Sequence, residues 1–120
     1  MAEKIKLAVF ISGRGSNMKA IIDACNNQRI DAVTYLVVSD NPEAAGLKYA
    51  DQHEIETLSF NPKEFKSKND YEHEIVQTLN EKEIDLICLA GYMRLIGDVL
   101  LAHYKDRIIN IHPSLLPAFK

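Results

Sequence analysis

Residues 5–17 read IKLAVFISGRGSN, and this stretch decides the fold class. A largely apolar run ends in a turn that contains two glycines, which is typical of a strand that leads into a tight loop. After the loop, Met18, Ile21, Ile22 and Cys25 recur at helical spacing and form the single apolar stripe of a helix packed on a core. The stretch therefore predicts a strand, a loop and a helix in succession.

The same alternation continues along the chain. Residues 32–38 are apolar and β-branched, which predicts a second strand, and residues 41–43 (Asn-Pro-Glu) predict the start of a helix that ends near Gln52. Nearly continuous apolar sequence at residues 85–90 predicts a strand that is covered on both faces. The other expected elements are a short strand at 54–58, a helix after the capping pair Ser67 and Asp70 with Tyr71, Ile75, Val76 and Leu79 on its apolar face, a short helix at 95–104 and a strand at 107–111.

This element order predicts an α/β fold: a Rossmann-like, open, mainly parallel sheet with helices on both faces. The length of 120 residues fits one domain spanning residues 1–120. Because 47% of the residues are hydrophobic, a disordered chain is excluded. Ligands of such sheets bind beyond the carboxyl ends of the strands, so functional residues are expected there.

Charge, membrane signals and cysteines indicate the class of partner and the compartment. The formal net charge of −3 gives no general attraction to nucleic acid or to an anionic membrane. No stretch approaches the roughly 20 apolar residues that span a bilayer, and the apolar run at residues 7–11 is too short for a signal-peptide core. Cys25 and Cys88 each lie within an apolar pattern, so we expect buried, reduced thiols and a cytoplasmic protein.

The loop at residues 12–17 (Ser-Gly-Arg-Gly-Ser-Asn) has the composition of a phosphate-binding turn. Glycines let backbone N–H groups approach an anion, and the start of the following helix adds unpaired donors. A P-loop is excluded because the loop has no lysine. A dinucleotide fingerprint is disfavoured because Met18 stands where the third glycine belongs, although Asp40 could serve a ribose. The alternative is an ordinary tight turn in which Ser16 caps the helix.

Asn110 and His112 are two residues apart in the last expected strand, so they project from the same face, while Ile109 and Ile111 face the opposite way into apolar packing. Pro113 ends the strand there. An amide can donate to a developing oxyanion, and a histidine moves protons near neutral pH, so the pair suits acyl transfer. The alternative is a histidine with a structural role only.

The other histidines, His53, His73 and His103, have no metal-ligand spacing. We expect them on the solvated surface and expect no metal site.

A third candidate loop is residues 91–96 (Gly-Tyr-Met-Arg-Leu-Ile). A flat apolar ligand with polar edges could lie against Tyr92, Met93 and Ile96. From these residues alone, ordinary loop packing with a solvated Arg94 is the simpler interpretation.

Three segments at the expected strand ends together resemble the phosphoribosylglycinamide (glycinamide ribonucleotide) formyltransferase family. They are ISGRGSN (residues 11–17), LAGYMR (residues 89–94) and NIHPSLLP (residues 110–117). The resemblance implies that Gly15, Ser16 and Asn17 hold the substrate phosphate, that Lys68, Met93, Arg94, Leu95 and Ile96 line the folate pocket, and that Asn110 and His112 are catalytic. At position 68 the family often has an arginine, and a lysine keeps the charge but loses the planar two-pronged contact.

The resemblance also implies an activity: direct formyl transfer from the cosubstrate 10-formyltetrahydrofolate to the amine of glycinamide ribonucleotide in purine biosynthesis, without a metal. The expected partners are small molecules, not nucleic acid or a membrane, and homodimer formation is left open. The alternatives are formyltetrahydrofolate hydrolysis, methionyl-tRNA formylation and a catalytically silent phosphate-binding module.

The family's domain normally continues beyond the NIHPSLLP segment with a glycine, a catalytic Asp, further strands and a C-terminal helix. Leu115, Leu116 and Phe119 would then have no following element to bury them. We therefore expect an incomplete domain that keeps the phosphate loop but has little or no turnover.

Overall fold

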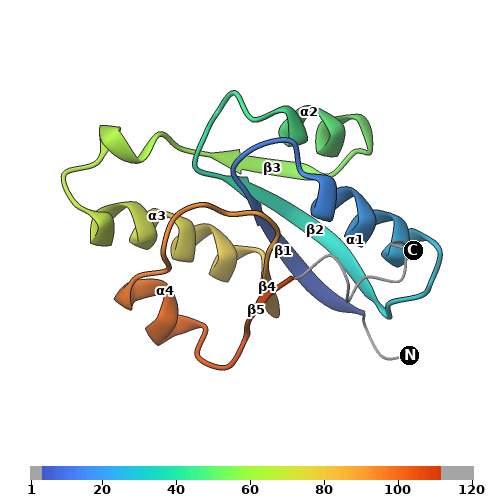
Figure 1. Ribbon diagram of the computed structural model, residues 1–120. Coiled ribbons are helices and arrows are strands. Elements are labelled where there is room, and N and C mark those ends of the chain that lie inside the picture. Colours follow the sequence, from blue (N-terminus) through green and yellow to red (C-terminus); the bar gives the residue numbers. More distant parts are fainter. Residues whose placement is uncertain (1–3, 112–120) are drawn as a thin grey trace.

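The computed structural model describes residues 4–111. Its elements follow the expected alternation (Figure 1). They are β1 (Ile5–Ile11), α1 (Ser16–Asn26), β2 (Ala32–Ser39), α2 (Ala45–Gln52), β3 (Glu56–Ser59), the 3-10 turn η1 (Pro62–Glu64), α3 (Lys68–Glu81), β4 (Leu86–Leu89), α4 (Asp98–His103) and β5 (Ile108–Asn110). Within the described residues the strands form one parallel sheet in the order β3-β2-β1-β4-β5. The α/β, Rossmann-like prediction is confirmed.

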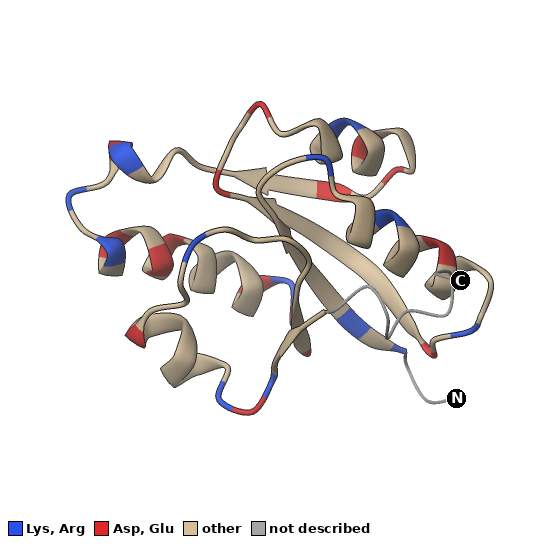
Figure 2. Ribbon diagram, in the orientation of Figure 1, with Lys and Arg blue, Asp and Glu red and all other residues tan. Residues whose placement is uncertain are grey.

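The central strand β1 separates two hydrophobic cores. Leu7 and Val9 point into the core beneath α1 and α2, while Ala8 and Phe10 point into the core beneath α3 and α4. Because successive side chains of a strand face opposite sides, one buried strand serves both layers. Figure 1 shows the two helix pairs on opposite faces of the sheet, and Figure 2 shows charged residues mainly on helices and loops, with few on the strands.

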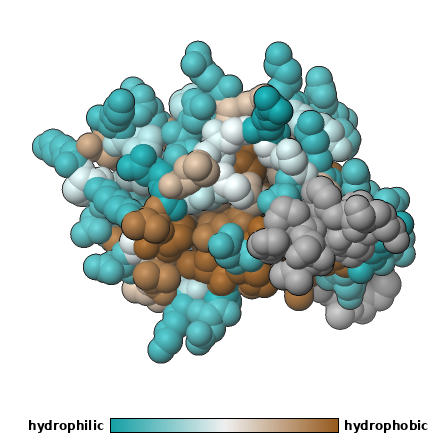
Figure 3. All heavy atoms as spheres, viewed as in Figure 1, coloured by the Kyte–Doolittle hydropathy of each residue, from teal (hydrophilic) through white to brown (hydrophobic). Residues whose placement is uncertain are grey.

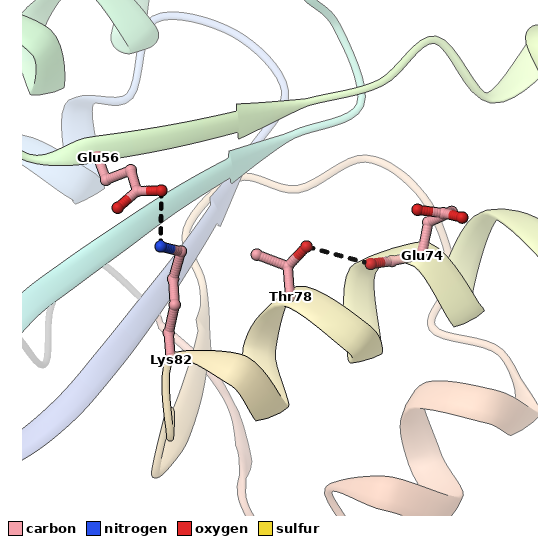
Figure 4. A network of polar contacts seen from close by, with 4 residues as sticks. All are labelled: Glu56, Glu74, Thr78 and Lys82. Carbon is pink, nitrogen blue, oxygen red and sulfur yellow. Dashed lines mark hydrogen bonds and ion pairs between the residues drawn. The ribbon is translucent and has the colours of Figure 1, made fainter.

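Helix α3 forms as the sequence predicts. The Ser67 Oγ accepts from the Asp70 N–H at 3.1 Å, which is the expected cap, and Tyr71, Ile75 and Leu79 are buried. At the far end, Lys82 Nζ lies 2.6 Å from Glu56 Oε2 of β3, and the Thr78 hydroxyl donates to the Glu74 carbonyl at 3.3 Å (Figure 4). Capping at one end and contact with β3 at the other therefore fix α3 along the sheet.

Two expected helix starts are wrong. Helix α2 begins at Ala45 and not after Asn41, because the Asn41 Oδ1 accepts from the Glu43 N–H at 3.0 Å and closes a turn instead. Helix α4 spans only Asp98–His103, so Leu95 and Ile96 belong to the preceding segment. The 3-10 turn η1, which Asn61 caps, was not expected from the sequence.

Ile109 of β5 is more exposed than expected. This side chain is 43% exposed, whereas packing against apolar neighbours was expected. Ile109 lines an apolar groove of about 370 Å³ together with Ile21, Leu86 and Ile111. No helix in residues 4–111 combines the length and the apolar character that crossing a bilayer requires.

Candidate functional site

A pocket of about 330 Å³ opens where the loops after β1 and β4 diverge. These two strands are neighbours at the centre of the sheet, and the chain turns to opposite sides after them, which is where open α/β sheets bind ligands. The residues that line this pocket are Ser12, Gly13, Arg14, Gly15, Ser16, Asn17, Ala90, Gly91 and Met93. The structure thus brings the expected phosphate residues of the loop after β1 (the first loop, residues 12–17) against the loop after β4 (the second loop, residues 91–96).

The first loop presents the N-terminus of α1 to this pocket. Gly15 adopts φ +77° as the N-cap, and the Lys19 N–H donates to its carbonyl at 2.8 Å. The N–H groups that precede Lys19 in the helix have no acceptor within it, and they carry the positive end of the helix dipole. Gly15, and not Ser16, caps the helix, so the alternative role given to Ser16 is wrong. The arrangement suits a phosphate group.

Gly46 of α2 supports this loop from behind, and sequence reasoning missed it. Its N–H donates to the Gly13 carbonyl at 3.0 Å. A Cβ at Gly46 would lie 2.5 Å from Ile11 Cδ1 and 3.1 Å from the Arg14 carbonyl oxygen, so the backbones approach closely only because the residue is glycine. The signal available in the sequence was a glycine inside a helical pattern.

The second loop is tied to the first through Ser12. The Met93 N–H donates to Ser12 Oγ at 2.8 Å, and Gly91 turns the chain with φ +79°. Met93 and Leu95 are 82% and 83% exposed, so two large apolar side chains are offered to solvent beside the pocket. Figure 3 shows hydrophobic residues gathered on the face that carries the segment between β4 and α4.

Tyr92 is half-buried, and neighbouring side chains contact both its hydroxyl and its ring. Its hydroxyl lies 3.0 Å from that of Tyr71, and its ring meets Phe10 edge-to-face at 5.3 Å. Burial, followed by the contact with Tyr71, raises the pKa of Tyr92 well above its usual range. Ile96 is likewise half-buried and packs against the core beneath α3 and α4, and the ligand-facing role expected for both side chains stays a prediction.

The remaining residues assigned to the folate pocket lie near the same segment but do not line the pocket described above. The Arg94 guanidinium lies 5.8 Å from the centre of the Tyr71 ring, so it stacks on α3 and is not simply solvated. Lys68, in the first turn of α3, passes beside Gly97. Of the five residues that the resemblance assigns to the folate pocket, Met93 alone lines the pocket described above.

Asn110 ends β5 at the carboxyl edge of the sheet, paired with Leu89 of β4, and the Ile111 N–H donates to the Leu89 carbonyl at 2.9 Å. The Asn110 side chain is exposed at the same edge as the two loops, although it does not line the pocket. His112 lies outside the described residues, so the expected pairing of Asn110 with His112 stays a prediction.

The cysteines and the remaining histidines have the expected surroundings. Cys25 and Cys88 are buried and unpaired with each other, and burial raises the pKa of Cys88 to about 11. His53, His73 and His103 are exposed. Across residues 4–111, no group of three or more His, Cys, Asp or Glu side chains is arranged to hold a metal ion.

Comparisons with known proteins agree with this geometry. The formyl transferase family model matches residues 5–120. Phosphoribosylglycinamide formyltransferase of Bacillus subtilis is 48% identical over 114 residues, which cover 95% of this chain and 58% of that protein, and the Escherichia coli protein of the same name is 38% identical over 96% of this chain and 54% of its own. The crystal structure of glycinamide ribonucleotide transformylase 1 from Geobacillus kaustophilus superimposes with a TM-score of 0.90 at 46% identity, covering 98% of this chain and 63% of that one.

This chain therefore spans somewhat more than half of the length of the relatives it matches. A match over nearly all of its residues, on the same parallel sheet, decides its classification: the chain belongs to the formyl transferase family.

Proposed function

We propose that this chain provides the phosphate-binding loop and part of the donor site of a phosphoribosylglycinamide formyltransferase. The observation that carries the proposal is the pocket in which the glycine loop at the start of α1 faces Gly91 and Met93. The phosphate of glycinamide ribonucleotide would bind the N–H groups at Ser16 and Asn17. The names of the relatives at 38–48% identity support this substrate.

The formyl donor would be 10-formyltetrahydrofolate, which supplies an activated formyl group. The exposed apolar side chains of Met93 and Leu95 suit a flat ring system, and Arg94 adds a cation for an acidic group. Backbone groups of the segment between β4 and α4 would orient its polar edges. The proposed substrates are therefore two small anions, and the proposed reaction uses no nucleic acid.

In the proposed reaction the substrate amine attacks the formyl carbon, and a tetrahedral intermediate forms. Asn110 would donate from its side-chain amide to the oxyanion, and His112 would help move a proton from the attacking amine to the departing nitrogen of the donor. The carbon–nitrogen bond to the donor then breaks, which leaves the formyl group on the substrate and the proton on tetrahydrofolate. No covalent enzyme intermediate is required. A reducing, cytoplasmic setting fits the buried free thiols.

The proposal is tested by thermal unfolding of the purified chain with glycinamide ribonucleotide. At about 100 times its dissociation constant, the ligand should stabilise the fold by about 2.7 kcal/mol. Ser16→Asp places a negative charge at the helix start, where it favours the helix but repels phosphate, so this variant should fold and lose the stabilisation.

The matched control is Ala45→Asp. It places the same charge on an exposed first residue of α2, outside the pocket, and should keep the response to the ligand. A folded wild-type chain that glycinamide ribonucleotide does not stabilise would overturn the proposal. Stabilisation by both glycinamide ribonucleotide and a folate analogue would support the formyltransferase, whereas stabilisation by glycinamide ribonucleotide alone would favour the silent phosphate-binding module.

A further inference from the structure

Glu72 is a buried carboxylate that the proposed reaction does not use. It lies on α3 and is 2% exposed. Its Oε2 accepts from the Gly97 N–H at 2.7 Å and its Oε1 accepts from the Leu100 N–H at 3.1 Å. A buried carboxylate is costly unless it is hydrogen-bonded, and here both oxygens are engaged by backbone donors.

These two bonds cap α4 from another helix. The N-cap of α4 is Gly97, which has no side chain to accept the free N–H groups of the first turn. Glu72 supplies that acceptor, and its negative charge lies at the positive end of the helix. A Cβ at Gly97 would lie 3.0 Å from both oxygens of Glu72, so glycine leaves the space that the carboxylate occupies.

The same turn of α3 holds the segment that precedes α4. The Tyr71 hydroxyl meets Tyr92 and the Tyr71 ring lies beneath Arg94. At the other end of the segment, Ser12 accepts from the Met93 N–H. The segment between β4 and α4 is therefore held from the phosphate loop near its start and by Glu72 at its end.

We infer that Glu72 is a positioning residue for the donor site. It does not touch the donor; it fixes the end of the segment that presents Met93, Arg94 and Leu95. The inference rests on the proposed function, because it assigns the donor to this segment. Loss of the carboxylate would release the segment while leaving the glycine loop, on the opposite side of the pocket, in place.

Glu72→Gln tests the inference, because it keeps the size of the side chain but turns an amide NH₂ toward a backbone N–H. Hydrogen exchange should accelerate about tenfold or more at whichever of the Gly97 and Leu100 amides faces the new NH₂ group, since its hydrogen bond to a charged group is lost. The dissociation constant of 10-formylfolate, an oxidised analogue of the donor, should rise by about tenfold, whereas that of inorganic phosphate should change by less than about twofold.

The control is Glu74→Gln, which makes the same chemical change on the exposed face of the same helix and should alter none of these measurements. Gly97→Ala is the second variant, should Glu72→Gln not fold; it displaces the carboxylate from the other side and should give the same split between the two ligands.

Equal weakening of both ligands, or unchanged exchange at Gly97 and Leu100, would overturn the positioning role. Failure of the proposed function has a different signature. In that case wild-type protein binds neither 10-formylfolate nor phosphate, while the exchange measurements still report whether Glu72 holds the segment.

Discussion

Replacement of Gly46 by alanine tests how the glycine loop is held against α2. The added Cβ would lie 2.5 Å from Ile11 Cδ1, 3.1 Å from the Arg14 carbonyl oxygen and 3.2 Å from that of Gly13. Ile11 is fully buried and has little room to move its methyl group. The two carbonyls belong to the loop backbone, so the loop itself must shift.

Two opposing effects decide the size of the change. Alanine is favoured over glycine within a helix by about 0.5–1 kcal/mol, and less than that in the first turn, where Gly46 lies. Overpacking a buried contact costs about 1–3 kcal/mol. The steric cost wins, and we expect Gly46→Ala to lower the free energy of unfolding by about 1–2 kcal/mol.

Urea unfolding followed by circular dichroism measures this change, with the phosphate dissociation constant as a second readout. The control is Gly13→Ala, where the added Cβ meets no atom within 4 Å and φ is not in the left-handed region. That variant should be as stable as wild type or slightly more stable. A Gly46→Ala chain at least as stable as wild type would refute the steric argument, and unchanged phosphate affinity would refute the link from α2 to the loop.

Three further changes have definite expected outcomes. Ser12→Ala removes the acceptor for the Met93 N–H and should cost about 1 kcal/mol in urea unfolding, with faster hydrogen exchange at Met93; unchanged exchange would contradict the contact. Ser67→Ala removes the α3 cap to Asp70 and should also cost about 1 kcal/mol, whereas an equal loss from a serine-to-alanine change off the cap would contradict this cause. Cys88, with a pKa raised to about 11 by burial, should resist a thiol reagent at pH 8 in the folded chain and react in urea. Because the unfolded thiol loses its proton near pH 9, before the folded one, stability should fall as the pH rises from 9 to 11, and the Cys88→Ala chain should lose this part of the pH dependence.

The sheet and its two layers could be predicted because local pattern and global burial agree. In β1, every residue from Leu7 to Ile11 is buried, and the run reads as apolar without interruption. The stripe through Met18 and Ile22 likewise faces a core. Where an element buries one face or both, the spacing of its apolar residues reflects that burial, so the element can be predicted from the sequence alone.

Two helix starts and the support of the loops could not be predicted in the same way. The start of α2 is decided by a competing local turn, and the start of α4 and the loop contacts depend on residues far apart in sequence. Asn41 is a residue type that often caps helices, but its side chain closes a local turn before α2 instead. The start of α4 depends on Glu72, which is 25 residues from Gly97. A charged residue in a helical pattern is normally expected on the solvated face, so nothing in the sequence marked Glu72 as buried.

The two loops of the candidate site are supported from opposite layers of the sheet. Gly46 of α2 fixes the glycine loop, and Glu72 of α3 fixes the segment before α4, while the bond from Met93 to Ser12 joins the two loops directly. A change in one layer should therefore weaken one ligand first. A change at Ser12 should affect both, because the bond from the Met93 N–H to Ser12 Oγ joins the two loops. Phosphate binding and donor binding are thus separable at Gly46 and Glu72 but linked at Ser12.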